Sequence, residues 1–304
     1  MALLIVPLSM ICLQIMAVGN KMIKDSMKRY FAILCVVALM VGCAKDNEVC
    51  QPQSVEPYSI SIDLQDEVAR TSLGEEENGL RKIYWSNGDC IAVNGVASLP
   101  LQLEEEQATY AKFLFNSVLE YPCEILYPAS FYKDATTITL PKEQQVVEGT
   151  FATNASPMAS IVATNEETPH MHHLAGVLHL QLMGNEKTRN NFICKIELTG
   201  NNGEQLYGDF TIDYEKAQLT PTSTKSKTIV VRLAEELSLT EITNIYIVVP
   251  AQEFENGFSV RLINDEGHFM DKVKRSAATI RKGGVLTMPV IEYVPTGTII
   301  GVEI

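Results

Sequence analysis

Short segments in which apolar and polar residues alternate recur along the chain from residue 58 onward, and tight turns separate them. In residues 58–64 every second residue is apolar, so an extended strand would have one hydrophobic and one polar face. Asn94-Gly95 and Asn256-Gly257 are dipeptides that tolerate positive φ and favour tight turns. No segment keeps the apolar period of an α-helix through three turns. The pattern predicts an all-β fold built from β-sandwiches.

The predicted strands fall into two groups along the chain. Beyond the first, they lie at residues 83–85, 91–93, 110–115, 124–127, 137–140, 160–163, 174–183, 192–199, 205–211, 228–233, 245–249, 258–263 and 285–290. Residues 144–169 are rich in Thr, Asn, Glu and Ala, and this composition favours a linker. We therefore expect an N-terminal β-sandwich over residues 58–168 and a C-terminal β-sandwich over residues 169–304.

The residues before the first strand carry a targeting signal. Lys28 and Arg29 precede the apolar run 30–41, and Gly42 stands directly before Cys43. The run is too short for a comfortable membrane span but suits a signal peptide. Residues 39–43 resemble a lipobox, with Met40 an unusual residue at its position. The resemblance implies that Cys43 is diacylated and becomes the mature N-terminus, followed by a tether over residues 43–57.

A second apolar segment, residues 1–19, precedes this signal. Two consecutive hydrophobic segments before a lipobox serve no evident purpose. We interpret Met27 as the translation start and residues 1–26 as an incorrectly assigned start, with an additional membrane segment as the alternative. The signal peptide then spans residues 27–42, and residues 1–42 are excluded from the fold prediction.

The charge of the chain limits its partners. The formal net charge is −13 at pH 7, and no run of basic residues with interleaved aromatics occurs. Nucleic acids and anionic lipid surfaces need cationic patches, so neither is an expected partner.

The cysteines indicate no fixed pairing. Cys50, Cys90, Cys123 and Cys194 are widely and irregularly spaced, so a disulfide is permitted but not required. Cys194 falls on the same alternation as Ile196 and is predicted to be a small buried hydrophobic residue.

The sequence contains none of the common catalytic motifs: a nucleophile elbow, a zinc-protease helix motif, a P-loop and a dinucleotide fingerprint are all missing. His170 and His172 would share one face of a strand, near His173 and His179, and imidazoles so placed can hold zinc or copper. No carboxylate or thiolate stands close by in the sequence to complete the ligand set. We predict a solvated lead-in to the next strand, with no metal, no cofactor and no enzymatic activity.

Trp85 is the only tryptophan in the chain. Glycan-binding surface lipoproteins usually stack sugars on several exposed aromatic rings. Trp85 stands between Tyr84 and a tight turn, so we expect it to fill the end of a sandwich core. An exposed aromatic platform would favour glycan binding, whereas a buried Trp85 without one would disfavour it.

Several segments occur in a recognisable order after the lipobox. In the first half they are Tyr58–Ile62, Ala69–Leu73, Ile83–Asp89 and Ile91–Gly95, and in the second half His173–Leu178, Ile196–Gly200, Val248–Pro250, Arg281–Gly284 and Met288–Pro289. Together they resemble the fimbrillin family of Bacteroidetes pilins. The resemblance covers essentially all of the chain after Cys43 and depends on order and spacing. The acid-rich residues 44–48 likewise resemble the tags that send lipoproteins to the cell surface, although an ordinary solvated tether has the same composition.

The resemblance implies two tandem transthyretin-like Greek-key β-sandwiches that assemble into surface pili. Subunits reach the surface with the lipid attached, and an arginine-directed protease trims an N-terminal strand. A strand from a neighbouring subunit then fills the exposed groove, which is donor-strand complementation. Arg70 and Thr71 match the cleavage position, although Arg70 could equally be an exposed turn residue. Ile300, Val302 and Ile304 alternate as a donor strand would, or they form the molecule's own last strand.

We therefore predict a non-enzymatic, lipid-anchored subunit that builds or decorates a fimbria on the outer membrane. Its partners would be other fimbrial subunits, the membrane through the lipid, and a host glycan or protein ligand. The alternative is a surface lipoprotein that binds glycan or another host ligand without polymerising. A hydrolase would require a cleft with converging carboxylates or histidines. The position of the subunit in the stalk, tip or anchor is left open.

Overall fold

The computed structural model describes residues 58–64, 73–77, 80–105, 108–146, 148–152 and 154–299, with no side-chain description at 73–77, 80–83 and 234–236. All of them belong to one compact unit, Glu56–Ile304. This part of the chain is all-β, and its helical structure is a single 3₁₀ turn, η1, at Ala129–Phe131. Within the described ranges, no helix has the length and apolar character needed to cross a membrane.

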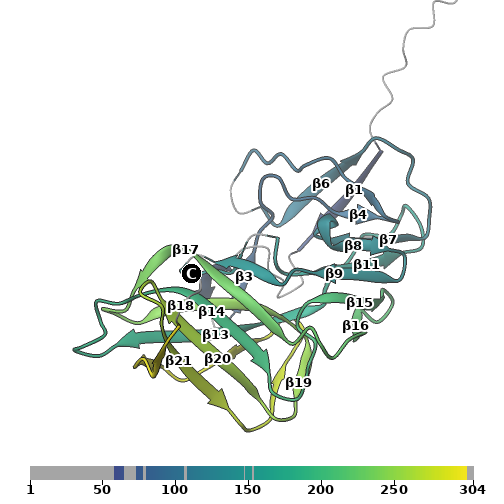
Figure 1. The fold of residues 1–304 in the computed structure, drawn as a ribbon. Helices are drawn as coiled ribbons and strands as arrows, with labels where there is room; N and C mark the ends of the chain where they lie inside the picture. Colours follow the sequence, from purple (N-terminus) through teal and green to yellow (C-terminus); the bar gives the residue numbers. More distant parts are fainter. Residues whose placement is uncertain are drawn as a thin grey trace, which may run out of the picture. The chain divides into compact units, whose positions relative to one another are not determined.

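Two sheets enclose the first hydrophobic core (Figure 1). One consists of β1 (Tyr58–Asp63) paired antiparallel with β6 (Tyr110–Phe115). The other has the strand order β12-β11-β7-β4-β5, with bounds His172–His173, Met158–Val162, Cys123–Tyr127, Ala92–Val93 and Val96–Ala97. Alternate residues of both sheets, together with Trp85, form a buried cluster that we call the first core.

A third sheet covers the opposite face of the five-stranded sheet. Its order is β16-β15-β9-β8, with bounds Gln218–Pro221, Gly208–Asp213, Thr137–Leu140 and Tyr132–Asp134. Leu126 on β7 packs in a second core with Ile138 and Phe210 from this sheet. Strands β7 and β11 are therefore buried on both faces, which is why their sequences are apolar at consecutive positions instead of alternating.

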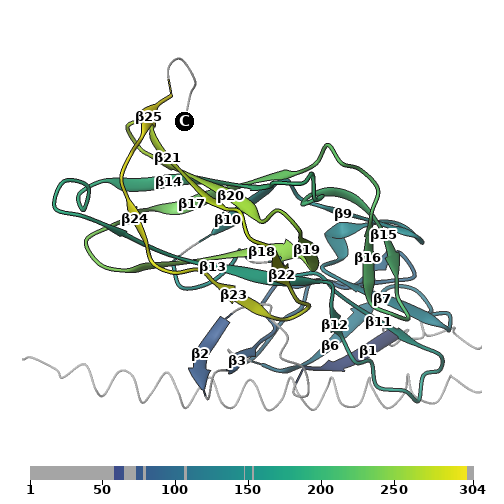
Figure 2. The same ribbon diagram turned by 90° about the horizontal axis from the view of Figure 1, so that it is seen from below.

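The third core lies between two larger layers (Figure 2). The upper layer has the order β10-β17-β14-β20-β21-β25, with bounds Glu143–Val146, Thr228–Ser238, Phe192–Gly200, Phe258–Asn264, His268–Lys274 and Gly297–Thr298. The lower layer has the order β18-β13-β23, with β24 also paired to β13, at Thr243–Pro250, Ala175–Gly184, Val285–Thr287 and Ile291–Tyr293. Two short antiparallel pairs complete the fold: β19 with β22 (Gln252–Phe254, Ala278–Ile280) and β2 with β3 (Leu73–Glu77, Leu80–Ile83).

The prediction of a linker over residues 144–169 is wrong. Most of β10 and all of β11 lie in this stretch, and β10 pairs in parallel with β17. Gln144 is buried, and its side-chain amide both donates to the Val248 carbonyl (2.7 Å) and accepts from the Val248 N–H (3.1 Å). A polar residue whose hydrogen bonds are satisfied in this way can be buried in a core. The polar composition of residues 144–169 alone does not reveal this and indicates a loop. The proposed division at residues 168 and 169 stays a prediction.

The turn predicted at Asn94-Gly95 is confirmed. Both residues have positive φ, 48° and 82°, and they connect β4 to β5. The Asn94 side chain also donates to the carbonyls of Glu120 (2.7 Å) and Pro122 (3.1 Å) and accepts from the Glu124 N–H (2.8 Å). The turn is therefore tied to the start of β7.

The prediction that Cys194 is buried is wrong. In β14 the register shifts between Ile193 and Lys195, so the inward alternation runs through Ile193 and Ile196. Cys194 lies half-buried beside this irregularity, and its thiol donates to the Ile263 carbonyl at 3.5 Å. One extra residue in a strand moves the following side chains to the other face, and simple alternation does not reveal it.

Candidate functional site: the edge strand and the pocket on it

Strand β1 forms the edge of the sheet that covers the first core (Figure 1). It pairs with β6 from Tyr58–Phe115 to Asp63–Tyr110, and β6 is its sole strand partner in the part of the chain that the structure describes. Ile60, Ile62 and Leu64 point into the first core and are 6%, 0% and 3% exposed. We call β1, Leu64 and the core side chains they cover the β1 site.

Hydrophobic burial holds β1 in place. A fully buried aliphatic side chain contributes about 2 kcal/mol, so the three side chains together rival the stability of a whole domain. Phe113 and Phe115 on β6 lie in the same cluster, both nearly inaccessible to water. Loss of β1 would therefore expose a groove with spaced apolar pockets and an unpaired strand edge on β6.

Trp85 lies in the core beneath β1, as predicted. It is 2% exposed and makes edge-to-face contacts with Phe113 (ring centroids 5.0 Å apart) and Tyr127 (5.3 Å). Its ring is closed to solvent and offers no surface for stacking a sugar.

A polar network is buried in the same region. Asp89 is 1% exposed; its carboxylate accepts from the Ser86 N–H (2.7 Å) and lies 3.0 Å from the Tyr127 hydroxyl, which also lies 2.9 Å from Asn154 Oδ1. The tyrosine has one proton for two acceptors. Burial raises the pKa of Asp89, and the hydrogen bonds that its carboxylate accepts from the Ser86 N–H and the Tyr127 hydroxyl partly oppose this shift.

Substitution of Asp89 tests this network. We expect Asp89→Ala to lower the free energy of unfolding by about 1–3 kcal/mol, because the Ser86 N–H loses its acceptor and the Tyr127 hydroxyl loses one of two. Asp89→Asn keeps one acceptor and one donor and should cost less.

The two variants should also differ in pH dependence. Because the folded state raises the pKa of Asp89 above its usual 3.8, the stability this group contributes is present at low pH and is lost as the pH rises above that value. Asp89→Asn should lack this decline. Urea unfolding at pH 4 and pH 7 measures both effects, and an equal cost for both variants at both pH values would contradict the assignment.

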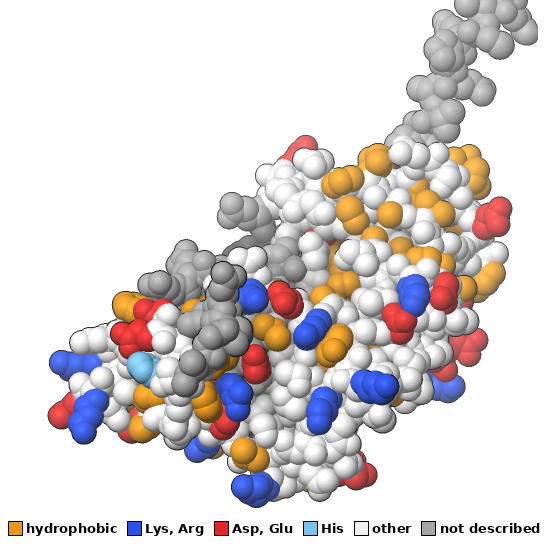
Figure 3. All heavy atoms as spheres, viewed as in Figure 1, with side chains coloured by type: hydrophobic (Ala, Val, Ile, Leu, Met, Phe, Trp, Pro, Cys, Tyr) orange, Lys and Arg blue, Asp and Glu red, His pale blue; other side chains and the backbone are white. Residues whose placement is uncertain are grey.

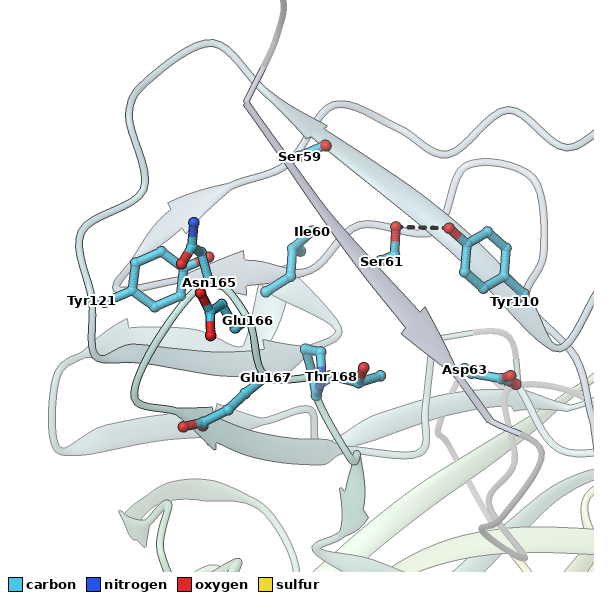
Figure 4. A pocket seen from close by; sticks show the side chains of 11 residues that line it. Ser59, Ile60, Ser61, Asp63, Tyr110, Tyr121, Asn165, Glu166, Glu167 and Thr168 are labelled. Atoms are coloured by element: carbon cyan, nitrogen blue, oxygen red, sulfur yellow. Dashed lines mark hydrogen bonds between the residues drawn. The ribbon is translucent and has the colours of Figure 1, made fainter.

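The polar face of β1 lines a pocket of about 390 Å³ (Figure 4). We call it the outer pocket. Its lining comprises four β1 residues, two tyrosines and one loop: Ser59, Ile60, Ser61, Asp63, Tyr110, Tyr121 and Asn165, Glu166, Glu167, Thr168, Pro169. The two tyrosines lie on opposite sides of β1, with Tyr121 beside Asn165 and Glu166.

Hydrogen bonds order part of this lining. The Tyr110 hydroxyl donates to Ser61 Oγ (2.8 Å), and Glu167 accepts from the Ala163 N–H (2.8 Å), which fixes the loop. Tyr110 and Tyr121 are 55% and 38% exposed. Partial burial raises the pKa of Tyr121.

The outer pocket has one sign of charge. Asp63, Glu166 and Glu167 contribute carboxylates, and the described residues that line the pocket include no lysine, arginine or histidine. Hydrophobic side chains gather on the surface over β1 and β6 (Figure 3). Such a surface suits a neutral or cationic ligand with apolar faces and repels an anion.

The residues predicted to carry lipidation, cleavage and strand donation lie outside the described residues. They are Cys43, Arg70, Thr71, Ile300, Val302 and Ile304. Leu64 and Leu73 are the nearest described residues on either side of Arg70, so β1 ends before the predicted cleavage position and β2 begins after it. The roles of these residues remain predictions.

The histidines that were considered as metal ligands do not share one face of a strand. His172 is exposed and His173 is buried on the two-residue strand β12. His179 lies on β13, stacked on Tyr246 with ring centroids 4.3 Å apart, and its Nε2 is 2.9 Å from Asn244 Oδ1. Within the described ranges, no group of three or more His, Cys, Asp or Glu side chains is placed to hold a metal ion.

The outer pocket was not predicted from the sequence. Alternation identified Ser59, Ser61 and Asp63 as the polar face of a strand, but such faces are usually only solvated. Residues 165–169 lie about a hundred positions away from β1, and no local signal in them points to this strand.

The chain matches no protein-family model and no curated protein. Three solved structures of candidate cell adhesion proteins are similar to it. That from Bacteroides uniformis has 12% identity and a TM-score of 0.44, and the match covers 80% of this chain and 94% of that one. That from Bacteroides fragilis has 13% identity and a TM-score of 0.42, with 80% and 93% covered. That from Bacteroides ovatus has 12% identity and a TM-score of 0.42, with 76% and 92% covered. At these values the likeness is distant.

Proposed function

We propose that this chain is a lipid-anchored structural and adhesive subunit of a surface fimbria, assembled by strand exchange at the β1 site. The lipid on Cys43 would hold the new subunit at the outer membrane. Cleavage after Arg70 would detach the lipid together with β1. A strand from another subunit would then occupy the vacated groove.

One observation carries the proposal: β1 is an edge strand, and its side chains Ile60 and Ile62, with Leu64 directly after it, close the first core. A strand in that place can be exchanged for another of the same alternation without rearranging the rest of the sheet. Arg70 follows this strand in the sequence and is the first arginine after Cys43. One cut there would separate β1 from every other described strand.

N-terminal sequencing and lipid analysis of protein recovered from cell surfaces, intact and after shearing, test the proposal. We expect sheared multimers that begin at Thr71 and lack the lipid. Arg70→Lys keeps the charge but removes the arginine, so an arginine-directed protease should leave this variant as acylated monomers. Arg275→Ala, at an exposed position, is the matched control and should assemble normally.

Two results would contradict strand exchange. One is the recovery of acylated Cys43 termini alone, on monomers that stay with the membrane. The other is an Arg70→Lys variant that assembles like the unmodified chain.

The outer pocket favours a second candidate function, a surface lipoprotein that binds glycan without polymerising. Trp85 is buried, but Tyr110 and Tyr121 are exposed aromatic rings that flank a polar hollow. The two functions do not exclude each other, because β1 lines the pocket mainly with polar residues, and among the described residues Ile60 alone belongs to both the pocket and the first core.

A further inference from the structure

Strand β1 contributes to two sites through its two faces. Its residues 59, 61 and 63 line the outer pocket, Ile62 closes the first core, and Ile60 does both. We propose that the outer pocket binds a neutral saccharide, and that binding retains β1 because the strand is the floor of the pocket. The retention of β1 concerns the same strand exchange as the proposed function and rests on it, whereas saccharide binding does not.

The chemistry of the lining selects the ligand class. Each sugar hydroxyl both donates and accepts hydrogen bonds, and the lining offers both kinds of partner. Donors come from the hydroxyls of serine, threonine and tyrosine and from the Asn165 amide, and acceptors from the same hydroxyls and three carboxylates. An ammonium group would use the acceptors alone. An anionic sugar would meet the carboxylates of Asp63, Glu166 and Glu167.

The shape of the pocket agrees with a small saccharide. A hollow of about 390 Å³ is in the range of small-ligand sites, and it is open to solvent on the surface of the sheet. Tyr110 and Tyr121 stand on either side of β1, where their rings can pack against the apolar faces of a sugar (Figure 4). The hydrogen bond from Tyr110 to Ser61 holds the side chain of Tyr110, and the bond from the Ala163 N–H to Glu167 holds the loop. Both parts of the lining are therefore ordered before a ligand binds.

The coupling to β1 follows from mass action. A ligand that needs Ser59, Ser61 and Asp63 binds while β1 is in place and is lost when β1 leaves. It therefore lowers the population of the open state by the factor 1 + [L]/Kd, which is about a hundred-fold at a concentration a hundred times Kd. A subunit that holds a saccharide should resist strand exchange, and exchange should in turn release the saccharide.

Binding is tested first, on the full chain in a detergent without a sugar headgroup. The probes are galactose, mannose, N-acetylglucosamine and lactose, with sialic acid and a trilysine peptide as charged comparisons, measured by saturation-transfer NMR and titration calorimetry. We expect at least one neutral sugar to bind and sialic acid not to bind. Tyr121→Ala and Asn165→Ala should each weaken binding about ten-fold, the loss of one good contact. Tyr58→Ala is the control, because Tyr58 is exposed on the same strand but does not line the pocket.

Three results overturn the site: none of the neutral sugars binds, trilysine binds in their place, or both pocket variants bind like the unmodified chain. Trp85 fluorescence confirms that each variant keeps the first core, and Asn165 lies on an exposed loop, so its loss should not disturb the sheet. Retention of β1 is then measured by amide exchange of residues 58–63 with and without the sugar. Unchanged exchange at saturation overturns the coupling. None of these readouts involves polymers, so a failure of fimbrial assembly would leave the saccharide result intact, and the reverse also holds.

Discussion

A chain that begins at Thr71 should lose the closed first core and regain it when a peptide of residues 57–65 is added. Without β1, the side chains of Ile60, Ile62 and Leu64 no longer cover the core, and β6 has a free edge. The lost burial is about 2 kcal/mol for each side chain, which is large against the usual stability of a domain. We expect the truncated chain to self-associate or to unfold at much lower denaturant concentration than the longer one.

Trp85 reports on this change directly. It is the only tryptophan in the chain, and it packs against Phe113 beneath β1. Its emission should move to longer wavelength in the truncated chain and return when the peptide binds. Size-exclusion chromatography measures the accompanying change in association state.

Two further peptides test whether restoration depends on apolar side chains and whether the C-terminal segment can replace β1. A peptide with Ile60→Asp and Ile62→Asp keeps the backbone but carries charge into the core, so it should fail to restore the emission. A peptide of residues 298–304 should restore it if the C-terminal alternation is a donor strand. Strand exchange at the β1 site would be refuted if the truncated chain were as stable and monomeric as the intact one.

Gly176→Ala should lower the free energy of unfolding by about 1–3 kcal/mol, through the layer that contains β13. Gly176 lies on β13, and a Cβ added there would be 2.2 Å from the Arg281 carbonyl oxygen and 2.7 Å from Ile280 Cγ2. Backbone bonds from Val177 to Gly284 and from Gly283 to Ala175 hold the loop against the strand. The new methyl group must break this contact or push β13 out of its layer.

Gly284→Ala is the matched control for that substitution. It lies in the same loop, but its added Cβ would come no closer than 3.3 Å, to Arg281 Cβ. Urea unfolding of both variants should show a clearly larger loss for Gly176→Ala. Equal losses would mean that the close approach at Gly176 is relieved by a small shift of the loop.

The segments that prompted the family resemblance meet in this contact. His173–Leu178 contains Gly176, and Arg281–Gly284 is the loop that rests on it. Each of the two segments contains glycine, and the segments are about a hundred residues apart in the sequence. This contact explains why residue 176 is a glycine, because the Cβ of any other residue would overlap the Arg281 backbone carbonyl.

Local patterns predicted much of the β structure. Alternation located the strands at 110–115 and 137–140 and the inward face of β1, because a half-buried strand must alternate. Strands such as β10 and β21 were missed. Their residues are mostly polar or charged, and backbone pairing holds them in the six-stranded layer: β10 pairs with the distant β17, and β21 pairs with β20, which directly precedes it in the chain.

Some determinants of the site arise from tertiary contacts alone. Asp89 follows a turn and would normally be solvated, yet the fold buries it beside Tyr127. Likewise, the outer pocket needs the loop 165–169 to lie near β1. Sequence alternation records which face of a strand is apolar, but it carries no information on which distant segment approaches the polar face.

The sequence by itself therefore determined the all-β class, the two faces of β1 and the tight turn at Asn94-Gly95, since each follows from the conformational and solvation preferences of neighbouring residues. The tertiary structure decided that β1 is an edge strand, that β7 and β11 are buried on both faces, and that the polar face of β1 lines a pocket. These features depend on packing between residues far apart in the chain, where the free energy of burial is set by the partner as well as by the residue itself.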